Sequence, residues 1–186
     1  MIANREIKLN DYVRALRLPF ISASVLPFIF GAFIVKSNFD IFSFILGLIA
    51  VIATHLGANL INDYADSRSG ADWQDQKWYA FFGGSKLIQE GLLSEKWYFK
   101  GAVFCFLVSS CCILGLSIHM SSFSVMGYYL LILFLGFSYS HKPLQLSYRR
   151  LGELVIFTHF GPAVVMGAYF IQTQILCKIN FYSRIF

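Results

Sequence analysis

The sequence predicts an all-α polytopic membrane protein, and three observations lead to this fold class. Of the 186 residues, 57% are hydrophobic and the mean hydropathy is +0.62. Only 13% are charged, against about 25% in an average soluble protein. The apolar residues gather into five stretches, each near the length of about 20 residues that crosses a hydrocarbon core as a helix. These observations exclude a disordered chain and a soluble globular domain.

Five membrane-spanning helices are expected, at 18–35, 41–61, 98–118, 124–140 and 154–175. The first apolar run follows a basic segment, but it is too long for a signal peptide and contains Pro27, so we expect it to be retained. Residues 1–186 form one membrane domain in this interpretation, with a short atypical tail at 176–186. The cysteines predict no disulfide framework, because Cys105, Cys111 and Cys112 fall in one apolar run and Cys177 stands alone.

The basic residues indicate how the spans are oriented. Twelve of the fifteen Lys and Arg residues precede the first span, lie in or beside the connection at 62–97, or separate the fourth span from the fifth. These segments share one side if every span crosses, and an excess of Lys and Arg marks the cytoplasmic side. We therefore expect a multi-pass protein of the cell (inner or plasma) membrane, with the N-terminus and the acidic connection cytoplasmic. No nucleic-acid-binding motif is present, so no nucleic-acid partner is expected.

A run of amide and acidic residues follows the second span. It begins Asn59-Leu-Ile-Asn62-Asp63-Tyr-Ala-Asp66 and continues to Asp72. If the second span continues as a helix through this run, residues three and four apart share a face, which brings an amide and two carboxylates together. Carboxylates so close repel each other, and Mg²⁺, which takes one or two carboxylates plus water and phosphate oxygens, relieves that repulsion. The alternative is a solvated helix end that binds no metal.

Two further polar clusters lie on the same side. Gly83-Gly84-Ser85-Lys86 allows backbone amides and an ammonium group to approach an anion, although an ordinary turn explains it as well. After the fourth span, residues 139–153 contain Lys142, Arg149 and Arg150, whose alternative role is anchoring at anionic lipid headgroups. Together with Arg17 at the start of the first span, these clusters would place acidic side chains that bind a metal and basic side chains that bind phosphates at one end of the bundle.

At these residues the sequence resembles the UbiA superfamily of membrane prenyltransferases. The stretch from Asn62 to Asp72 resembles the first aspartate-rich motif of that superfamily. Residues 83–92, 148–153 and 160–173 resemble the 1,4-dihydroxy-2-naphthoate (menaquinone) polyprenyltransferases within it, and the likeness covers about residues 10–175. The resemblance implies transfer of a polyprenyl group from polyprenyl diphosphate to an aromatic quinone precursor. The acceptor would be 1,4-dihydroxy-2-naphthoate or a related ring, with loss of carbon dioxide, in menaquinone biosynthesis.

The resemblance also implies a role for each site residue, with Mg²⁺ as the cofactor. The implied metal ligands are Asn62, Asp63, Asp66 and Asp72. The implied diphosphate-binding cations, which neutralise the leaving group, are Arg17, Lys86, Lys142 and Arg149. The groups expected to act in catalysis are Asp63, Asp66, Lys142 and Arg149. The rings of Tyr139 and Tyr148 would shelter an allylic cation, whereas His55 and His159 are expected to form hydrogen bonds between helices, outside the site.

The sequence departs from the family pattern in its extent. Such proteins are similar in having nine spans and a second aspartate-rich motif, whereas no Asp or Glu follows Glu153 here. We therefore expect a C-terminally truncated chain with half of the Mg²⁺–diphosphate site, for which the sequence does not predict activity alone. Besides the substrates and the lipid bilayer, the expected partners are a second copy or a complementary C-terminal fragment. Two alternatives stay open: an inactive fragment, and a non-catalytic membrane protein that binds or transports a cation.

Overall fold

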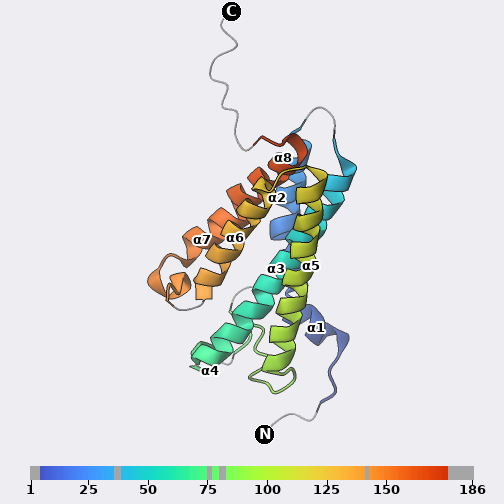
Figure 1. Cartoon of the computed structure of the whole chain (residues 1–186). Helices are drawn as coiled ribbons and strands as arrows, with labels where there is room; N and C mark the ends of the chain where they lie inside the picture. Colours follow the sequence, from blue (N-terminus) through green and yellow to red (C-terminus); the bar gives the residue numbers. More distant parts are fainter. Residues whose placement is uncertain (1–4, 36–38, 75–76, 80–82, 141–142, 176–186) are drawn as a thin grey trace, which may run out of the picture.

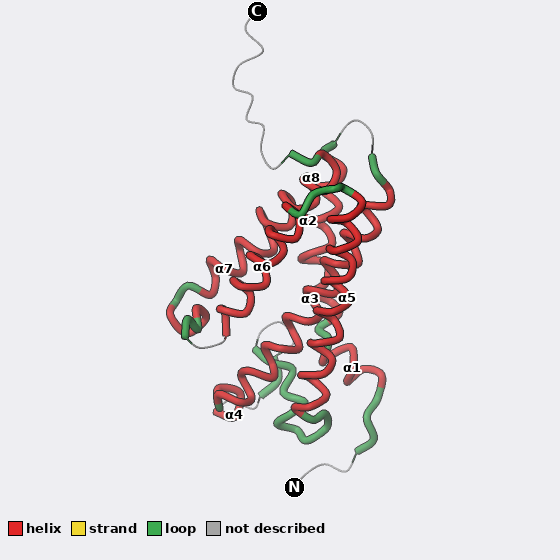
Figure 2. Tube along the Cα trace, in the orientation of Figure 1, coloured by secondary structure: helices red, strands yellow, loops and turns green. Residues whose placement is uncertain are grey.

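The chain forms a bundle of helices in the computed structural model, which describes residues 5–35, 39–74, 77–79, 83–140 and 143–175. No strand occurs in these ranges. The helices of the bundle run up and down in turn (Figures 1 and 2), so the all-α class is confirmed. In chain order the elements are α1 (Leu9–Ala15), the 3₁₀ turn η1 (Leu18–Ile21), α2 (Ser22–Phe33), α3 (Ile41–Ser69), α4 (Ala71–Gln74), α5 (Glu95–His119), α6 (Ser124–Ser140), the 3₁₀ turn η2 (Leu146–Arg149), α7 (Gly152–Thr158), the π-helical turn η3 (His159–Ala163) and α8 (Val164–Thr173).

Each of the five expected spans corresponds to helix in the structure. The second is longer than expected, because α3 runs on to Ser69 and ends only where Gly70 takes a left-handed backbone with φ +85°. The fifth is interrupted by the π-helical turn, which contains Pro162. Proline has no N–H to donate within a helix, so the hydrogen-bond ladder widens locally at this position.

By length and composition, three described helical segments can cross a membrane on their own: Ile41–Ser69, Glu95–His119 and Gly152–Thr173. A fourth candidate combines Leu9–Ala15 with Leu18–Phe33, which are bent by 42° relative to each other. The remaining expected span, Ser124–Tyr139, is apolar but shorter than the others. A helix of its length measures about 25 Å, slightly less than the hydrocarbon core of about 30 Å.

Small residues allow the helices to approach closely. A Cβ at Gly31 of α2 would lie 2.3 Å from the carbonyl oxygen of Val165 in α8, and one at Gly57 of α3 would lie 2.9 Å from the ring of Phe106 in α5. Small side chains at helix crossings are the usual means of close packing in a membrane, where no hydrophobic force drives helices together. They bring α3 against α5 and α2 against α8.

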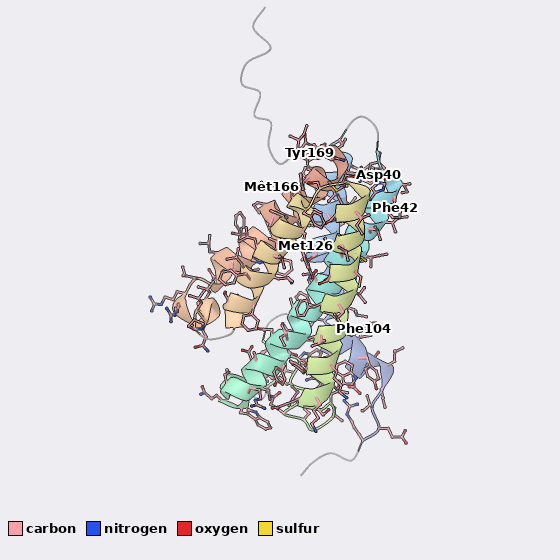
Figure 3. All side chains as sticks on the ribbon, in the orientation of Figure 1. Asp40, Phe42, Phe104, Met126, Met166 and Tyr169 are labelled. Carbon is pink, nitrogen blue, oxygen red and sulfur yellow. The ribbon has the colours of Figure 1, made fainter. Side chains whose placement is uncertain are left out.

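The two ends of the bundle carry different sets of polar residues. At the upper end in Figure 1, Asp40 before α3 bonds to His119 at the end of α5, and Gln172 of α8 exchanges two hydrogen bonds with the Asp40 backbone. Figure 3 places Asp40 at this end, far from α4. The first helix, α4 and the connection between α6 and α7 lie at the lower end. The three basic segments therefore share one end, as the sequence predicts.

Candidate functional site

The acidic run lies within the last three turns of α3. The expected continuation of the second span is therefore correct, because Asn62, Asp63 and Asp66 are all helical. Asp63 is 2% exposed, whereas Asn62 and Asp66 are half-buried. A fully buried carboxylate is tolerated only where charged or hydrogen-bonding groups compensate it. The neighbours of Asp63 therefore define the centre of the site.

Asp63 binds one group from each of two distant segments. Its Oδ1 atom forms an ion pair with the guanidinium of Arg17, which lies between α1 and η1. Its Oδ2 atom accepts a hydrogen bond of 2.9 Å from the backbone N–H of Ser85. The Ser85 hydroxyl in turn lies 2.6 Å from the hydroxyl of Tyr98 in α5. The end of α3 is thus joined to the start of the first span, to the glycine-containing loop and to α5.

A second buried ion pair holds the same loop against α4. The Lys86 ammonium lies 2.6 Å from Oδ1 of Asp72, and both side chains are less than a tenth exposed. A Cβ at Gly84 would lie 2.5 Å from Oδ2 of Asp72, so glycine is the residue that lets the loop approach this carboxylate. Figure 2 shows the connection at the lower end of the bundle, beside α4 and α5.

A cleft of about 510 Å³ opens beside these ion pairs. Its walls include Arg14 and Arg17, the rings of Trp78 and Tyr79, and residues 83–85 of the glycine-containing loop. Arg14 binds both carboxylate oxygens of Glu90, at 2.6 and 3.2 Å, and its guanidinium carbon lies 4.4 Å from the centroid of the Trp78 ring. The described lining contains two arginines and no acidic residue, and both arginines are held in ion pairs with acids outside that lining.

The C-terminal end of α6 lies toward the same end of the bundle (Figure 1). Tyr139 is in its last turn. Among the predicted residues, the structure thus places seven at one end of the bundle: Arg17, Asn62, Asp63, Asp66, Asp72, Lys86 and Tyr139.

Other predicted site residues are not brought together with this group. Arg149 is exposed, and its guanidinium donates to the carbonyl of Pro143 within its own connection. Figure 1 shows this connection at the same end as α4 but apart from it. Lys142 and the side chain of Tyr148 lie outside the described residues. The role of these three residues stays a prediction.

The described residues can be tested for their fit to the expected Mg²⁺. No group of three or more His, Cys, Asp and Glu side chains within the described ranges could hold a metal ion, and Asp63 and Asp72 each bind a cationic side chain. Mg²⁺ differs from zinc in needing only one or two carboxylates, with water and phosphate completing its octahedron. Asn62 and Asp66 are one turn apart at the end of α3. Their amide and carboxylate oxygens form a donor set that fits this requirement.

Both histidines inside the spans join neighbouring helices, as expected from the sequence. Nδ1 of His55 lies 2.7 Å from the hydroxyl of Ser24 in α2, and Nε2 of His159 lies 3.2 Å from the carbonyl oxygen of Ile132 in α6. Neither contacts the acidic run through these bonds.

The comparison with known proteins settles the family of the chain. A model of the UbiA prenyltransferase family matches residues 24–183. The chain belongs to the UbiA prenyltransferase family. Its relatives include 2-carboxy-1,4-naphthoquinone phytyltransferase of a Synechocystis strain, which is 27% identical over 169 residues, covering 88% of this chain and 51% of that protein.

Relatives from animals match this UbiA chain with similar identity and coverage. UbiA prenyltransferase domain-containing protein 1 of Xenopus tropicalis is 29% identical over 175 residues, covering 91% of this chain and 48% of that protein. The Homo sapiens protein of the same description is 28% identical over 171 residues, covering 89% and 48%. The chain thus spans about half the length of the curated relatives it matches. No solved structure gives a significant match.

Several groups at the site of this UbiA chain were not assigned from the sequence. They are the backbone N–H of Ser85, the Arg14–Glu90 pair and the ring of Trp78. Asn10 and Arg14 are four residues apart in α1, and this helical spacing could have indicated that one face of α1 lines the cleft. Glu90 offered no such signal, because it lies 76 residues from its partner Arg14.

Proposed function

We propose that this chain supplies the diphosphate-binding half of an aromatic prenyltransferase. The substrate would be a polyprenyl diphosphate and the acceptor an aromatic quinone precursor, 1,4-dihydroxy-2-naphthoate or a related ring, with loss of carbon dioxide, in menaquinone biosynthesis. The observation that carries the proposal is the arginine-lined cleft beside the buried Arg17–Asp63 pair. Membership in the UbiA family supports the reaction class, and the printed name of the Synechocystis relative supports a carboxylated naphthalene ring as acceptor.

Hydrogen-bond donors fixed at the cleft would bind the diphosphate as it leaves. Arg14, Arg17 and the backbone of residues 83–85 all line it. Guanidinium and backbone N–H groups donate hydrogen bonds to phosphate oxygens, and donors held in place before the reaction stabilise negative charge as it develops on the departing diphosphate. We therefore assign the diphosphate to this cleft and its departure to the two arginines.

The charge balance around the cleft supports a divalent cation. Each of the three described cations there is paired with one acid: Arg14 with Glu90, Arg17 with Asp63 and Lys86 with Asp72. These pairs add no net charge with which to neutralise a diphosphate. Mg²⁺ would supply the missing positive charge. Asn62 and Asp66 would hold it, while Asp63 keeps Arg17 in position from behind.

The reaction also requires that the bundle exclude water from the reacting prenyl group. Loss of the diphosphate leaves an allylic cation, which water would capture as an alcohol unless the bundle excludes it. The Tyr139 ring, at the end of α6, would shelter that cation by cation–π attraction. The prenyl tail would lie along the apolar helices, away from the cleft.

The test uses the whole chain in lipid vesicles. Binding of geranylgeranyl diphosphate and transfer to 1,4-dihydroxy-2-naphthoate are measured with Mg²⁺ and after chelation by EDTA. Chelation and the substitution Asp66→Asn are each expected to weaken diphosphate binding at least tenfold. The matched control is Glu95→Gln at the same end of the bundle, where Glu95 accepts a hydrogen bond from Ser67 outside the cleft. It is expected to bind as the unaltered chain does.

Three outcomes decide between the interpretations. Binding that depends on both Mg²⁺ and Asp66, followed by transfer, supports the whole proposal. Binding without transfer supports the diphosphate site and contradicts catalysis by this chain alone. Diphosphate binding that is indifferent to EDTA and to Asp66→Asn would contradict the assigned metal ligands.

A further inference from the structure

The first helix carries apolar side chains that face outward. Leu9 and Tyr12 are three residues apart and share one face of α1. Leu9 is 78% exposed, and Tyr12 and the preceding Ile7 are exposed to a smaller extent. Asp11 and Ala15, on another side of the helix, are buried. The exposed apolar side chains therefore point away from the bundle, and we call Ile7, Leu9 and Tyr12 the outer apolar face.

A contact with α5 sets the level of this face along the bundle. The ring centroids of Tyr12 and Trp97 lie 5.8 Å apart, and Figure 1 shows α1 beside the lower part of α5. On α5 the exposed residues change from the cation Lys100 to the apolar Val103 and Phe104.

This change marks where the apolar part of the span begins. Lys100 follows Trp97 by three residues, which is about 4.5 Å along the helix axis. The headgroup layer is thicker, at about 5–7 Å on each side of a bilayer. Tyr and Trp are the residues that gather in that layer. The ring pair therefore places the outer apolar face at the level of the lipid headgroups.

Three exposed lysines accompany this face. Lys8 precedes α1, and Lys96 and Lys100 are one turn apart at the start of α5. Within the described part of the chain, none of the three forms an ion pair with an acid. Glu6 is exposed beside Lys8, but the lysines leave positive charge in excess. Lysines near the surface of an anionic bilayer are attracted to its lipids, so the charge complementarity indicates an anionic lipid surface as the partner.

We propose that α1 lies in the headgroup layer of an anionic lipid leaflet, with its outer apolar face in the acyl boundary and the three lysines at lipid phosphates. Helices with an apolar face and flanking cations bind membranes in this position. Burial in the acyl boundary removes Leu9 from water, while the long stem of Lys8 lets its ammonium group reach the phosphates. The bend of 42° between α1 and Leu18–Phe33 turns α1 away from the direction of the span.

The lipid contact uses a different side of α1 from the arginine-lined cleft. Asn10 and Arg14 line that cleft, and neither belongs to the outer apolar face. The inference therefore does not rest on what the cleft binds. It adds that lipid contacts help to hold one wall of the cleft at the membrane surface.

The test measures the depth of α1 in the bilayer. The whole chain, with its four cysteines replaced by serine, carries one spin-labelled cysteine in vesicles of phosphatidylcholine and phosphatidylglycerol. Leu9→Cys is compared with Asn10→Cys on the cleft side and with Leu107→Cys on the exposed apolar face of α5. The label at position 9 is expected to collide more often with oxygen, which concentrates in lipid, than with a water-soluble nickel chelate. Position 107 is expected to share this preference, and position 10 to show the reverse.

The lysines are tested with the same label at position 9. Adding phosphatidylglycerol to vesicles of phosphatidylcholine alone is expected to move the label deeper. This gain is expected to disappear when Lys8, Lys96 and Lys100 are all replaced by glutamine. The matched control is Arg150→Gln, which removes an exposed cation of the α6–α7 connection and is expected to keep the gain. Folding of every variant is checked by its elution as a single species in detergent.

Each outcome decides for or against the lipid contact. Oxygen preference at position 9 together with a gain that needs the three lysines would support the proposal. Nickel collisions as frequent as at position 10 would overturn it. Few collisions with either reagent would also overturn it, because they would show that protein, such as a second copy of the chain, covers the outer apolar face. A phosphatidylglycerol effect that survives loss of the lysines would contradict their assignment to lipid phosphates. None of these results bears on the diphosphate site, because the vesicles contain no diphosphate.

Discussion

Arg17 combines a strained backbone with a buried contact. Its φ of +50° lies in the left-handed region, which costs about 1–2 kcal/mol for a residue with a Cβ. Its guanidinium binds the buried Asp63 carboxylate and lines the cleft. Residues held in such conformations gather at functional sites, where the surrounding structure enforces them. At Arg17 the strained backbone and the ion pair with Asp63 occur in the same residue.

The first prediction concerns this pair. Arg17→Gly relieves the backbone strain but leaves Asp63 buried without its cation, and Asp63→Asn leaves Arg17 without its anion. Each is expected to lower the free energy of unfolding by about 3 kcal/mol, the cost of an uncompensated buried charge. The double variant is expected to lose much less than the sum, as measured by denaturant unfolding in detergent. Additive losses would show that the pair contributes no coupling energy.

Gly84 provides a second prediction at the scale of one residue. In Gly84→Ala the new Cβ would lie 2.5 Å from the Asp72 carboxylate, which must move and loosen the buried pair with Lys86. We expect a loss of about 2 kcal/mol in unfolding free energy, as for an overpacked core. Gly127→Ala is the control, because nothing lies within 4 Å of a Cβ built there. A loss of equal size in both variants would contradict the steric argument.

Local spacing made some of these residues predictable and not others. Asn62, Asp63 and Asp66 are recognisable because polar groups three and four apart at the end of an apolar helix share a face. Their partners are not recognisable in this way. Nothing local to Asp63 indicates that the Ser85 N–H will bind it, because that contact depends on how a loop of another segment folds back. The sequence therefore indicates Arg17 and Lys86 as cations of the site but not the ion pairs that they form with Asp63 and Asp72.

At the scale of elements, α3 connects the two ends of the bundle. Its polar lower end carries the acidic run, and its upper end begins at Asp40, whose side chain accepts from the N–H groups of Phe42 and Ser43. Burial raises the pKa of the Asp40 carboxyl, but hydrogen bonds from Ser43, His119 and these N–H groups outweigh it. They hold the pKa below its ordinary value of 3.8.

This pKa predicts how stability depends on pH. A carboxyl whose pKa is lower in the folded than in the unfolded chain stabilises the fold fully above the unfolded pKa. That stabilisation is lost as the pH falls below about 4, where the unfolded chain binds the proton first. Thermal unfolding in detergent, measured between pH 6 and pH 3, should show a steeper loss for the unaltered chain than for Asp40→Asn. Parallel curves would contradict this role for Asp40.

The positions of the helices along the chain were predictable, because the length of each apolar stretch indicates a spanning helix. The breaks were less so: the 3₁₀ turn before α2 and the π-helical turn around Pro162 depend on backbone hydrogen bonds that hydropathy does not report. The added length of α3 follows from the absence of Gly and Pro between residue 61 and Gly70. Polar residues there extend the helix beyond its apolar stretch, which is how the acidic run comes to be held rigidly.

At the scale of the whole molecule, charge is arranged along the bundle axis. The first helix, the glycine-containing loop and the α6–α7 connection bring their basic residues to the end that also holds the acidic run. The opposite end has the Asp40–His119 pair. The excess of Lys and Arg at one end predicts that this end faces the cytoplasm.

Single cysteines placed at the two ends can decide this orientation. In a chain whose four cysteines are replaced by serine, Ser94→Cys lies at the start of α5 and Ser122→Cys follows its end. A membrane-impermeant maleimide added to intact spheroplasts is expected to label the second cysteine and to reach the first only after lysis. Folding of both variants is checked by equal labelling in detergent. Labelling of Ser94→Cys from outside would show that the orientation is the reverse of the predicted one. The arginine-lined cleft would then lie on the outer face, where the membrane potential and the available substrates both differ.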